Sequence, residues 1–121
     1  MNIQYIRDYC LNKPHTIETF PFDQNTLVFK VADKMFALVP LEKWEQGLAA
    51  ISLKAKPEYS IELRAENRSV EPAFHMNKKH WNTIHLYKAE LQPELILKLI
   101  DHSYTMVVQT MSKKKQKELG F

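Results

Sequence analysis

The sequence predicts an α+β domain, a two-layer sandwich in which helices cover one face of an antiparallel sheet of about five to six strands. Three observations predict this fold. Six short apolar segments bounded by turn residues suit strands, and three longer segments carry apolar residues at helical spacing. Short turns join most of the strand segments, which favours antiparallel pairing. The 121 residues suffice for one core, so we expect a single domain over residues 1–121.

Each of the three predicted helices begins at a residue that suits a helix start. Asn2 can cap the first helix, and Pro57 and Pro93 suit the first turns of the second and third. The predicted helices span residues 2–12, 57–67 and 93–111. Their expected buried residues are Ile3, Ile6 and Cys10 in the first, Ile61, Leu63 and Ala65 in the second, and Ile96, Leu99, Ile100, Ser103, Val107 and Thr110 in the third.

Six strands are predicted between these helices. They span residues 15–20, 26–31, 34–39, 50–54, 70–76 and 80–87. A short helical turn over residues 42–46, closed by Gly47, is expected before the fourth strand. Residues 113–121 form a lysine-rich C-terminal end, and the sequence leaves open whether this end is ordered or flexible.

The second and third strands are predicted to form a hairpin, because only Ala32 and Asp33 separate them. A two-residue loop fixes the register, and the apolar pattern agrees with that register. The predicted pairs are Val31 with Lys34, Phe29 with Phe36, and Leu27 with Leu38, and the opposite face would carry Val28, Lys30, Met35 and Ala37. We expect Phe29 and Phe36 to lie in the core.

Composition and motifs exclude several classes of protein. Two glycines, Gly47 and Gly120, cannot supply a phosphate-binding loop or a dinucleotide motif, so no nucleotide cofactor is expected. The single Cys10 cannot form an internal disulfide or a Cys-based zinc site, and it suits a reducing cytosol. No apolar run is long enough to span a membrane, and the N-terminus does not resemble a signal peptide. We therefore expect a cytoplasmic protein without a membrane partner.

Charge is distributed unevenly along the chain. Residues 1–73 hold nine basic and ten acidic residues, whereas residues 74–121 hold eight lysines and four acidic residues. Residues 72–89 contain no acidic residue but carry Lys78, Lys79 and Lys88. These lysines are either ordinary solvated residues of a turn and a chain end or part of a surface that attracts an anionic partner.

Two groups of residues suggest enzymatic or metal chemistry, and their spacing argues against both. Asp101, His102 and Ser103 are the residue types of a hydrolase triad, but consecutive residues on a helix point about 100° apart and cannot converge. The histidines at positions 75, 80 and 85 are spaced by odd numbers, so strands would place neighbouring ones on opposite faces. We expect no catalytic residues and no metal site.

The turn around residues 75–81 is the strongest candidate for a binding site. Lys78 and Lys79 can contact phosphates, Asn77 can bond to base edges, and an exposed His80 or Trp81 can stack on bases. Alternatively, Trp81 belongs to the core and the lysines are an ordinary solvated turn. If Ile84 faces the core, strand alternation places Trp81 on the opposite face unless a bulge intervenes.

Four segments resemble the MmcQ/YjbR family of small bacterial proteins. Residues 75–84 read HMNKKHWNTI, and the other three stretches are TLVFKVADKMFALV at 26–39, ISLKAKPE at 51–58 and LIDHSYTMVV at 99–108. The resemblance covers almost the whole chain in the expected order. It departs from the family pattern at Ala32 and Asp33, where glycine or asparagine is usual, and at Lys56, where aspartate is frequent.

The resemblance implies a compact fold like that of frataxin-type or secretion-chaperone-type domains. It also implies DNA binding by two hairpin wings. By position, one wing is the hairpin that carries Lys30 and Lys34, and the other is the turn from Asn77 to Trp81.

These observations lead to two functional hypotheses, and a third reading, an enzyme or metal protein built on His75, His80 and His85, is disfavoured by the spacing given above. The first is a non-enzymatic DNA-binding protein that grips duplex phosphates through its lysine-bearing wings. Its expected site residues are Lys30, Lys34, Asn77, Lys78, Lys79, His80 and Trp81. The alternative is a chaperone-like module that binds a protein or a small ligand on the exposed sheet face, with a footprint on Val28, Met35 and Ala37.

Overall fold

Six antiparallel strands form one open sheet in the order β1-β2-β3-β4-β6-β5. The computed structural model describes all 121 residues of the chain. The strands are β1 (Thr16–Thr19), β2 (Thr26–Val31), β3 (Lys34–Pro40), β4 (Ala50–Lys54), β5 (Val70–Pro72) and β6 (Trp81–His85). Their number and pairing agree with the predicted sheet.

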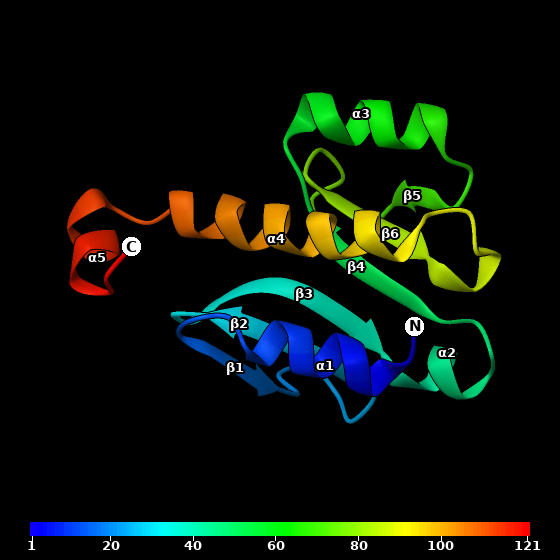
Figure 1. Ribbon diagram of the computed structural model, residues 1–121, viewed down its shortest axis with the longest axis horizontal. Helices are drawn as coiled ribbons and strands as arrows, with labels where there is room; N and C mark the ends of the chain where they lie inside the picture. Colours follow the sequence, from blue (N-terminus) through cyan, green and yellow to red (C-terminus); the bar gives the residue numbers. More distant parts are fainter.

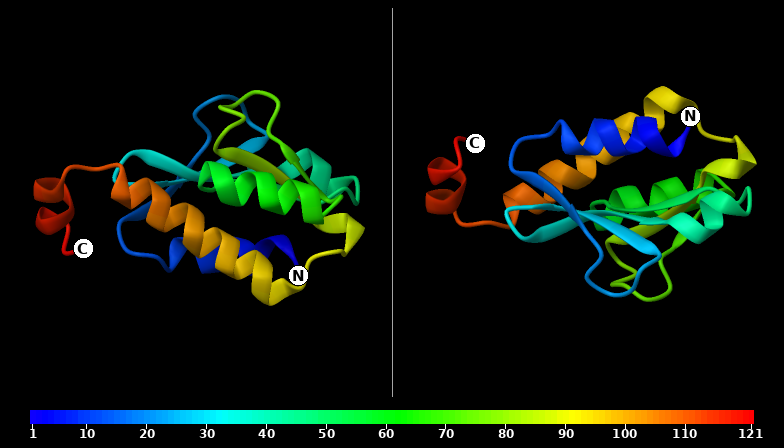
Figure 2. Two further views of the ribbon diagram at one scale, coloured as in Figure 1. Left: turned by 90° about the horizontal axis from the view of Figure 1, so that it is seen from above. Right: turned by 90° about the horizontal axis from the view of Figure 1, so that it is seen from below.

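The three longest helices lie on one side of this sheet, as predicted. The helices of the protein are α1 (Ile3–Leu11), α2 (Leu41–Glu45), α3 (Pro57–Glu66), α4 (Pro93–Gln109) and α5 (Lys113–Glu118), with a short 3-10 helix, η1 (Leu86–Lys88). The long helix α4 packs on β3 and β4, α1 packs on β1, and α3 packs on β5 (Figures 1 and 2). No helix is both long enough and apolar enough to cross a lipid bilayer.

The predicted helix starts are present. The Asn2 side chain accepts a hydrogen bond from the Tyr5 backbone N–H at 2.8 Å and so caps α1. Proline stands in the first turn of both α3 and α4. The lysine-rich C-terminal end is helical, and the Ser112 hydroxyl caps it by accepting from the Lys115 N–H at 3.1 Å.

The core lies between the sheet and the helices and contains 21 buried apolar residues. Phe29 and Phe36 are fully buried there, as predicted, with ring centroids 6.4 Å apart. Tyr104 of α4 packs edge-on against Phe36 at 5.2 Å. Cys10 is fully buried on α1, and burial raises the pKa of its thiol to about 12, so this thiol is not a nucleophile at neutral pH.

The tip of the β2–β3 hairpin follows the predicted register. Val31 pairs with Lys34, and only Ala32 and Asp33 connect the strands. The backbone φ angle is +47° at Ala32 and +70° at Asp33, as a type I′ turn requires. The turn therefore has the geometry that suits a two-residue hairpin, although neither residue is the glycine that this geometry favours.

Beyond the tip, a β-bulge between Phe29 and Lys30 shifts the pairing by one residue. The observed pairs are Phe29 with Ala37, Val28 with Leu38, and Leu27 with Val39. The predicted register was therefore wrong here: Ala37 belongs to the core beside the helices, and Leu38 faces away from them. The reason is that Phe36 is the extra residue of the bulge, so that Phe36 and Ala37 both join the core.

Three predicted buried positions, Ile61, Ala65 and Thr110, are exposed. Ile61 is 67% exposed on α3, where Ser60 is buried in its place because its hydroxyl accepts a hydrogen bond from the Asn82 amide at 2.9 Å. Thr110 caps the end of α4 rather than continuing its apolar stripe. Tyr104 joins that stripe instead, and its hydroxyl donates to the Pro14 carbonyl.

Candidate nucleic-acid interface

Two loops protrude from the face of the sheet that lies opposite α1 and α4. They comprise residues 20–25, between β1 and β2, and residues 73–80, between β5 and β6 (Figure 2). We call this surface the loop-bearing face. It contains Lys30 of the first sequence-predicted wing, which projects from β2 on this face, and the 77–81 turn of the second wing. Lys34 is paired with Val31, a core residue, and therefore lies at the hairpin tip on the helix-covered face.

The second loop exists because β5 is shorter than predicted. The strand predicted over residues 70–76 ends at Pro72, and one further backbone hydrogen bond, from the Ala73 N–H to the Trp81 carbonyl at 3.0 Å, completes its pairing with β6. Residues 73–80 then cross the loop-bearing face, where Ala73 and Trp81 form a small buried cluster with Val28 and Leu38. The sheet face opposite the helices was expected to be exposed, but this loop covers it at Val28 and Leu38, so the expectation is wrong there.

Asn77 and Trp81 maintain the shape of this loop. The Asn77 side chain accepts from the Lys79 N–H at 2.9 Å, and its carbonyl accepts from the Trp81 N–H at 2.8 Å. Trp81 lies on the face opposite Ile84, as strand alternation predicted, but only 7% of it is exposed. Its indole is part of the buried cluster and is not available for stacking on a base.

His80 is also turned inward. Its carbonyl accepts from the Ala55 N–H at 2.7 Å, which joins the end of the loop to the end of β4. Its ring Nδ1 is buried and has no hydrogen-bond partner. Three of the seven predicted site residues, Asn77, His80 and Trp81, thus form the frame of the loop.

Sequence reasoning missed Arg64 of α3, which anchors the loop from behind. Its Nε donates to the Asn82 side chain at 2.7 Å, and its Nη2 donates to the carbonyls of Lys78 and Trp81. Burial lowers the pKa of the Arg64 guanidinium below its ordinary value. No sequence signal indicates this role, because Arg64 lies 14 residues from Lys78 and meets it only in the folded chain.

The loop presents its charged residues outward. Lys78 and Lys79 are both exposed. The ammonium of Lys78 lies 5.8 Å from the ring centroid of Phe74, which is itself 75% exposed. An aromatic ring and a cation are thus adjacent at the outer end of the loop.

A hollow of about 410 Å³ lies beside the tip of the β2–β3 hairpin. It is lined by Pro21, Phe22, Lys30, Asp33, Lys34, Met35, Lys54, Val107 and Thr110. The hollow follows from the sheet: β3 and β4 pair only at Ala37 with Leu53 and Leu38 with Ser52. Where they separate, the Ser103 hydroxyl bridges them by donating to the Phe36 carbonyl at 2.6 Å and accepting from the Lys54 N–H at 2.8 Å.

The lysines of this region are free of carboxylate partners. The ion pairs of the protein join Arg7 to Glu18, Lys13 to Asp101 and His85 to Glu71. None of them involves Lys30, Lys34, Lys54, Lys78 or Lys79. Asp33 is the one acidic residue that lines the hollow.

The residues that suggested a hydrolase triad have separate structural roles. Asp101 accepts from the Tyr9 hydroxyl at 2.7 Å and pairs with Lys13. His102 accepts from the Lys56 N–H at 3.3 Å, and burial together with the nearby Lys56 ammonium lowers the pKa of its imidazole. Because Ser103 bridges β3 and β4, the three side chains do not meet.

The three histidines of the basic segment do not converge either. His75 is exposed in the loop, His80 is turned inward, and His85 pairs with Glu71 at 3.2 Å. No group of three His, Cys, Asp or Glu side chains is placed to hold a metal ion.

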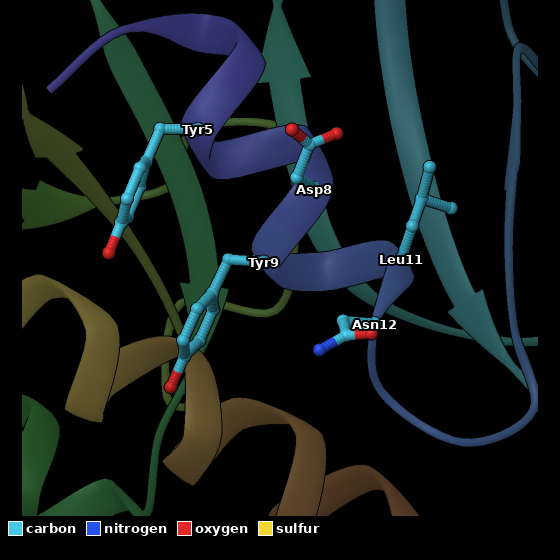
Figure 3. Close-up of a pocket in the computed structure, with 5 residues that line it drawn as sticks. All are labelled: Tyr5, Asp8, Tyr9, Leu11 and Asn12. Atoms are coloured by element: carbon cyan, nitrogen blue, oxygen red, sulfur yellow. The ribbon is translucent and has the colours of Figure 1, made fainter.

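Two further hollows lie outside the loop-bearing face. One, of about 560 Å³, lies along α1, and its side chains diverge: Tyr5 and Tyr9 point to one side, whereas Leu11 points away from them (Figure 3). The other, of about 840 Å³, has 15 lining residues, of which 10 are hydrophobic. It lies between the start of α1, α2 and the start of α4, and Trp44 is among its lining residues.

Comparison with known proteins places the chain in a family. A family model described as YjbR matches residues 11–106. The protein YjbR of Escherichia coli K12 is 34% identical over 119 residues, which are 98% of each chain. YbdF of Escherichia coli O157:H7 is 34% identical over 110 residues, covering 90% of this chain and 86% of its own.

Two solved structures have a fold similar to that of this chain. The crystal structure of Deinococcus radiodurans DR2400, a DUF419 domain, has a TM-score of 0.89 at 39% identity, over 99% of this chain and 88% of that one. A Pseudomonas syringae protein has a TM-score of 0.72 at 32% identity, over 88% of this chain and 99% of its own. These matches support the resemblance read from the sequence and the fold that it implied. The chain belongs to the YjbR family.

Proposed function

We propose that this protein is a non-enzymatic DNA-binding protein that holds backbone phosphates on its loop-bearing face. The observation that carries the proposal is the set of five lysines described above, none of which has a carboxylate partner. Lys30, Lys34 and Lys54 line one hollow, and Lys78 and Lys79 project from the neighbouring loop. Lysines without carboxylate partners attract a polyanion and release its counterions on binding.

The proposal divides the predicted site residues into two roles. The lysines contact phosphates, whether the DNA is duplex or not. Asn77, His80 and Trp81 act through the loop that they hold in place, so their substitution would alter affinity by displacing Lys78 and Lys79. Lys54 joins the contact set, although sequence reasoning did not single it out.

The test is a titration of a labelled mixed-sequence duplex, followed by fluorescence anisotropy at several salt concentrations. If three or four lysines neutralise phosphates, the slope of log affinity against log salt is about −3 to −4. The double variant Lys78→Glu with Lys79→Glu should bind more weakly and reduce the magnitude of this slope by about 2. Its melting temperature should fall by no more than a few degrees, because both side chains are exposed.

The matched control places the same charge change on α5. Lys113 and Lys114 are exposed there and lie away from the loop-bearing face (Figure 1). The variant Lys113→Glu with Lys114→Glu should retain most of the affinity. Equal losses in the two double variants would overturn the site assignment, and an absence of binding at low salt would overturn the function.

The alternative function, a protein- or ligand-binding module, is supported by a different surface from the one predicted. Val28 and Ala37 are fully buried, so the expected footprint on the sheet face is wrong. The apolar hollow beside Trp44 suits a small apolar ligand instead. Since the Trp44 indole is fixed by donating to the Ala50 carbonyl at 2.9 Å, its fluorescence in a Trp81→Phe variant would report such a ligand.

A further inference from the structure

We infer that the loop-bearing face takes unpaired nucleotides, with Phe22 and Phe74 stacking on bases while the adjacent lysines hold the phosphates. The inference rests on the proposed DNA binding and specifies which form of DNA binds most tightly. It is carried by a juxtaposition: each of the two protruding loops displays an exposed phenylalanine beside lysines.

The exposure of these two rings is unusual for phenylalanine. Phe74 is 75% exposed and Phe22 is 62% exposed, although phenylalanine is among the residue types most often buried. Neither ring packs against another aromatic ring of the protein. No aromatic ring of the protein occupies a face of either phenylalanine, and the one cation over the Phe74 ring is the Lys78 ammonium.

Both rings are carried by loops with defined backbone contacts. Phe74 follows the buried Ala73, in the loop that Arg64 anchors. Phe22 precedes Asp23, whose carboxylate accepts from the N–H groups of Asn25 at 2.8 Å and Thr26 at 2.7 Å. These contacts hold the loops in place, so that stacking would cost little ordering of the protein.

Each ring has a cation beside it. Phe22 lines the same hollow as Lys30, Lys34 and Lys54, and the Lys78 ammonium lies 5.8 Å from the Phe74 ring centroid. An aromatic ring next to a lysine matches the repeat of a single strand, in which each base has a phosphate beside it. In a duplex the base faces are already stacked on one another, so the rings would have no base to receive them.

Exposed phenylalanines beside lysines are also found on proteins that bind anionic membranes. Two features favour nucleic acid. The rings lie on two separate loops rather than forming one apolar patch, and three of the lysines line a hollow instead of a convex surface. Membrane binding is therefore an outcome that the experiment distinguishes.

The test compares a labelled 20-mer of thymidine with a 20-base-pair duplex by anisotropy at one salt concentration. The wild-type protein should bind the single strand at least 5-fold more tightly. The variants Phe22→Ala and Phe74→Ala should each weaken single-strand binding about 5-fold or more and leave duplex binding within about 2-fold. Phe74→Trp should retain or increase single-strand affinity, which a loss of structure would not produce.

The matched control is Ile61→Ala, which removes a similarly exposed apolar side chain from α3 and should change neither affinity. Thermal melting of every variant separates a stacking defect from unfolding. Equal affinity for the two DNA forms, or unchanged single-strand binding in both alanine variants, would overturn the inference and leave the proposed function standing. Binding to phosphatidylserine vesicles, with no binding to either DNA form, would overturn both.

Discussion

The two faces of the sheet differ in how their apolar residues are covered. On one face, α1, α3 and α4 cover a core of 21 buried residues. On the loop-bearing face, the buried cluster has only four members, Val28, Leu38, Ala73 and Trp81, and the residues around it are lysines and exposed phenylalanines. The first face therefore contains most of the buried apolar residues, whereas the second leaves Phe22 and Phe74 exposed to solvent.

This difference separates residues that stabilise the fold from residues that would bind a ligand. Substitutions on the helix-covered face should alter the free energy of unfolding. Substitutions of the outward residues on the loop-bearing face should alter affinity and leave stability almost unchanged. The residues that connect the loop to the sheet should affect both.

The largest effect is expected on the helix-covered face. Phe36→Ala should lower the free energy of unfolding by about 3–5 kcal/mol, because Phe36 is fully buried against Phe29 and Tyr104. Urea unfolding of the purified protein measures this loss. Phe74→Ala is the counterpart on the other face and should cost less than about 0.5 kcal/mol. Similar losses in the two variants would contradict the contrast between the faces.

An intermediate effect is expected where α3 meets the loop. Arg64→Met should lower the free energy of unfolding by about 1–3 kcal/mol, because it leaves the Asn82 side-chain oxygen and the Lys78 carbonyl without their donor. It should also weaken DNA binding, since Lys78 and Lys79 lose their anchor. Amide hydrogen exchange of residues 73–80 would show the loosening directly. Arg68→Met, which removes an exposed arginine nearby, provides the control and should show neither effect.

A smaller effect of opposite sign is expected at the hairpin tip. Asp33→Gly should raise the free energy of unfolding by up to about 1 kcal/mol, because φ at Asp33 is +70°, a conformation that glycine adopts without strain. The same change removes the one carboxylate that lines the lysine hollow, so DNA affinity should rise slightly. Asp33→Asn removes the charge but keeps a side chain, so it separates the effect of the charge on DNA affinity from the effect of the turn geometry on the free energy of unfolding. A destabilised Asp33→Gly variant would show that the turn is not strained.

The smallest effect is a pH dependence on the loop-bearing face. The N–H groups of Thr26 and Asn25 hold the pKa of the Asp23 carboxyl below its ordinary value. Because the folded-state pKa is lowered, this contribution to stability is complete above about pH 4 and is lost as the pH falls through the folded-state value. The difference in unfolding free energy between wild type and Asp23→Ala should therefore shrink from pH 6 to pH 2.5. A constant difference would mean that the carboxylate does not stabilise the 20–25 loop.

Local signals in the sequence were sufficient for much of the fold. The Asn2 cap, Pro57, Pro93 and the two-residue loop at Ala32 and Asp33 each act within a few residues, and each was predicted correctly. The bulge at Phe36 was not predicted, because the two-residue loop fixes the pairing only next to the tip, and the contact of Phe36 with Tyr104 is not visible in the sequence.

In the candidate site too, the sequence predicted what depends on neighbouring residues and missed what depends on residues distant in the chain. Alternation along β6 placed Trp81 on the correct face, but its burial depends on Val28 and Leu38, which lie on other strands. Arg64 could not be recognised, because its partners are 14 to 18 residues away. Lys78 and Lys79 were singled out because a run of basic residues without acids is visible in the sequence itself.

The most direct test of the central claim is a nuclear magnetic resonance titration of ¹⁵N-labelled protein with a short thymidine oligonucleotide. Our account predicts that the amide shifts which change belong to residues 20–25, 30–35 and 73–80 and to Lys54. The amides of α1 and of the hollow beside Trp44 should remain unchanged. Changes confined to α5, to the Trp44 hollow or to the helix-covered face would contradict the assignment of the loop-bearing face as the nucleic-acid interface.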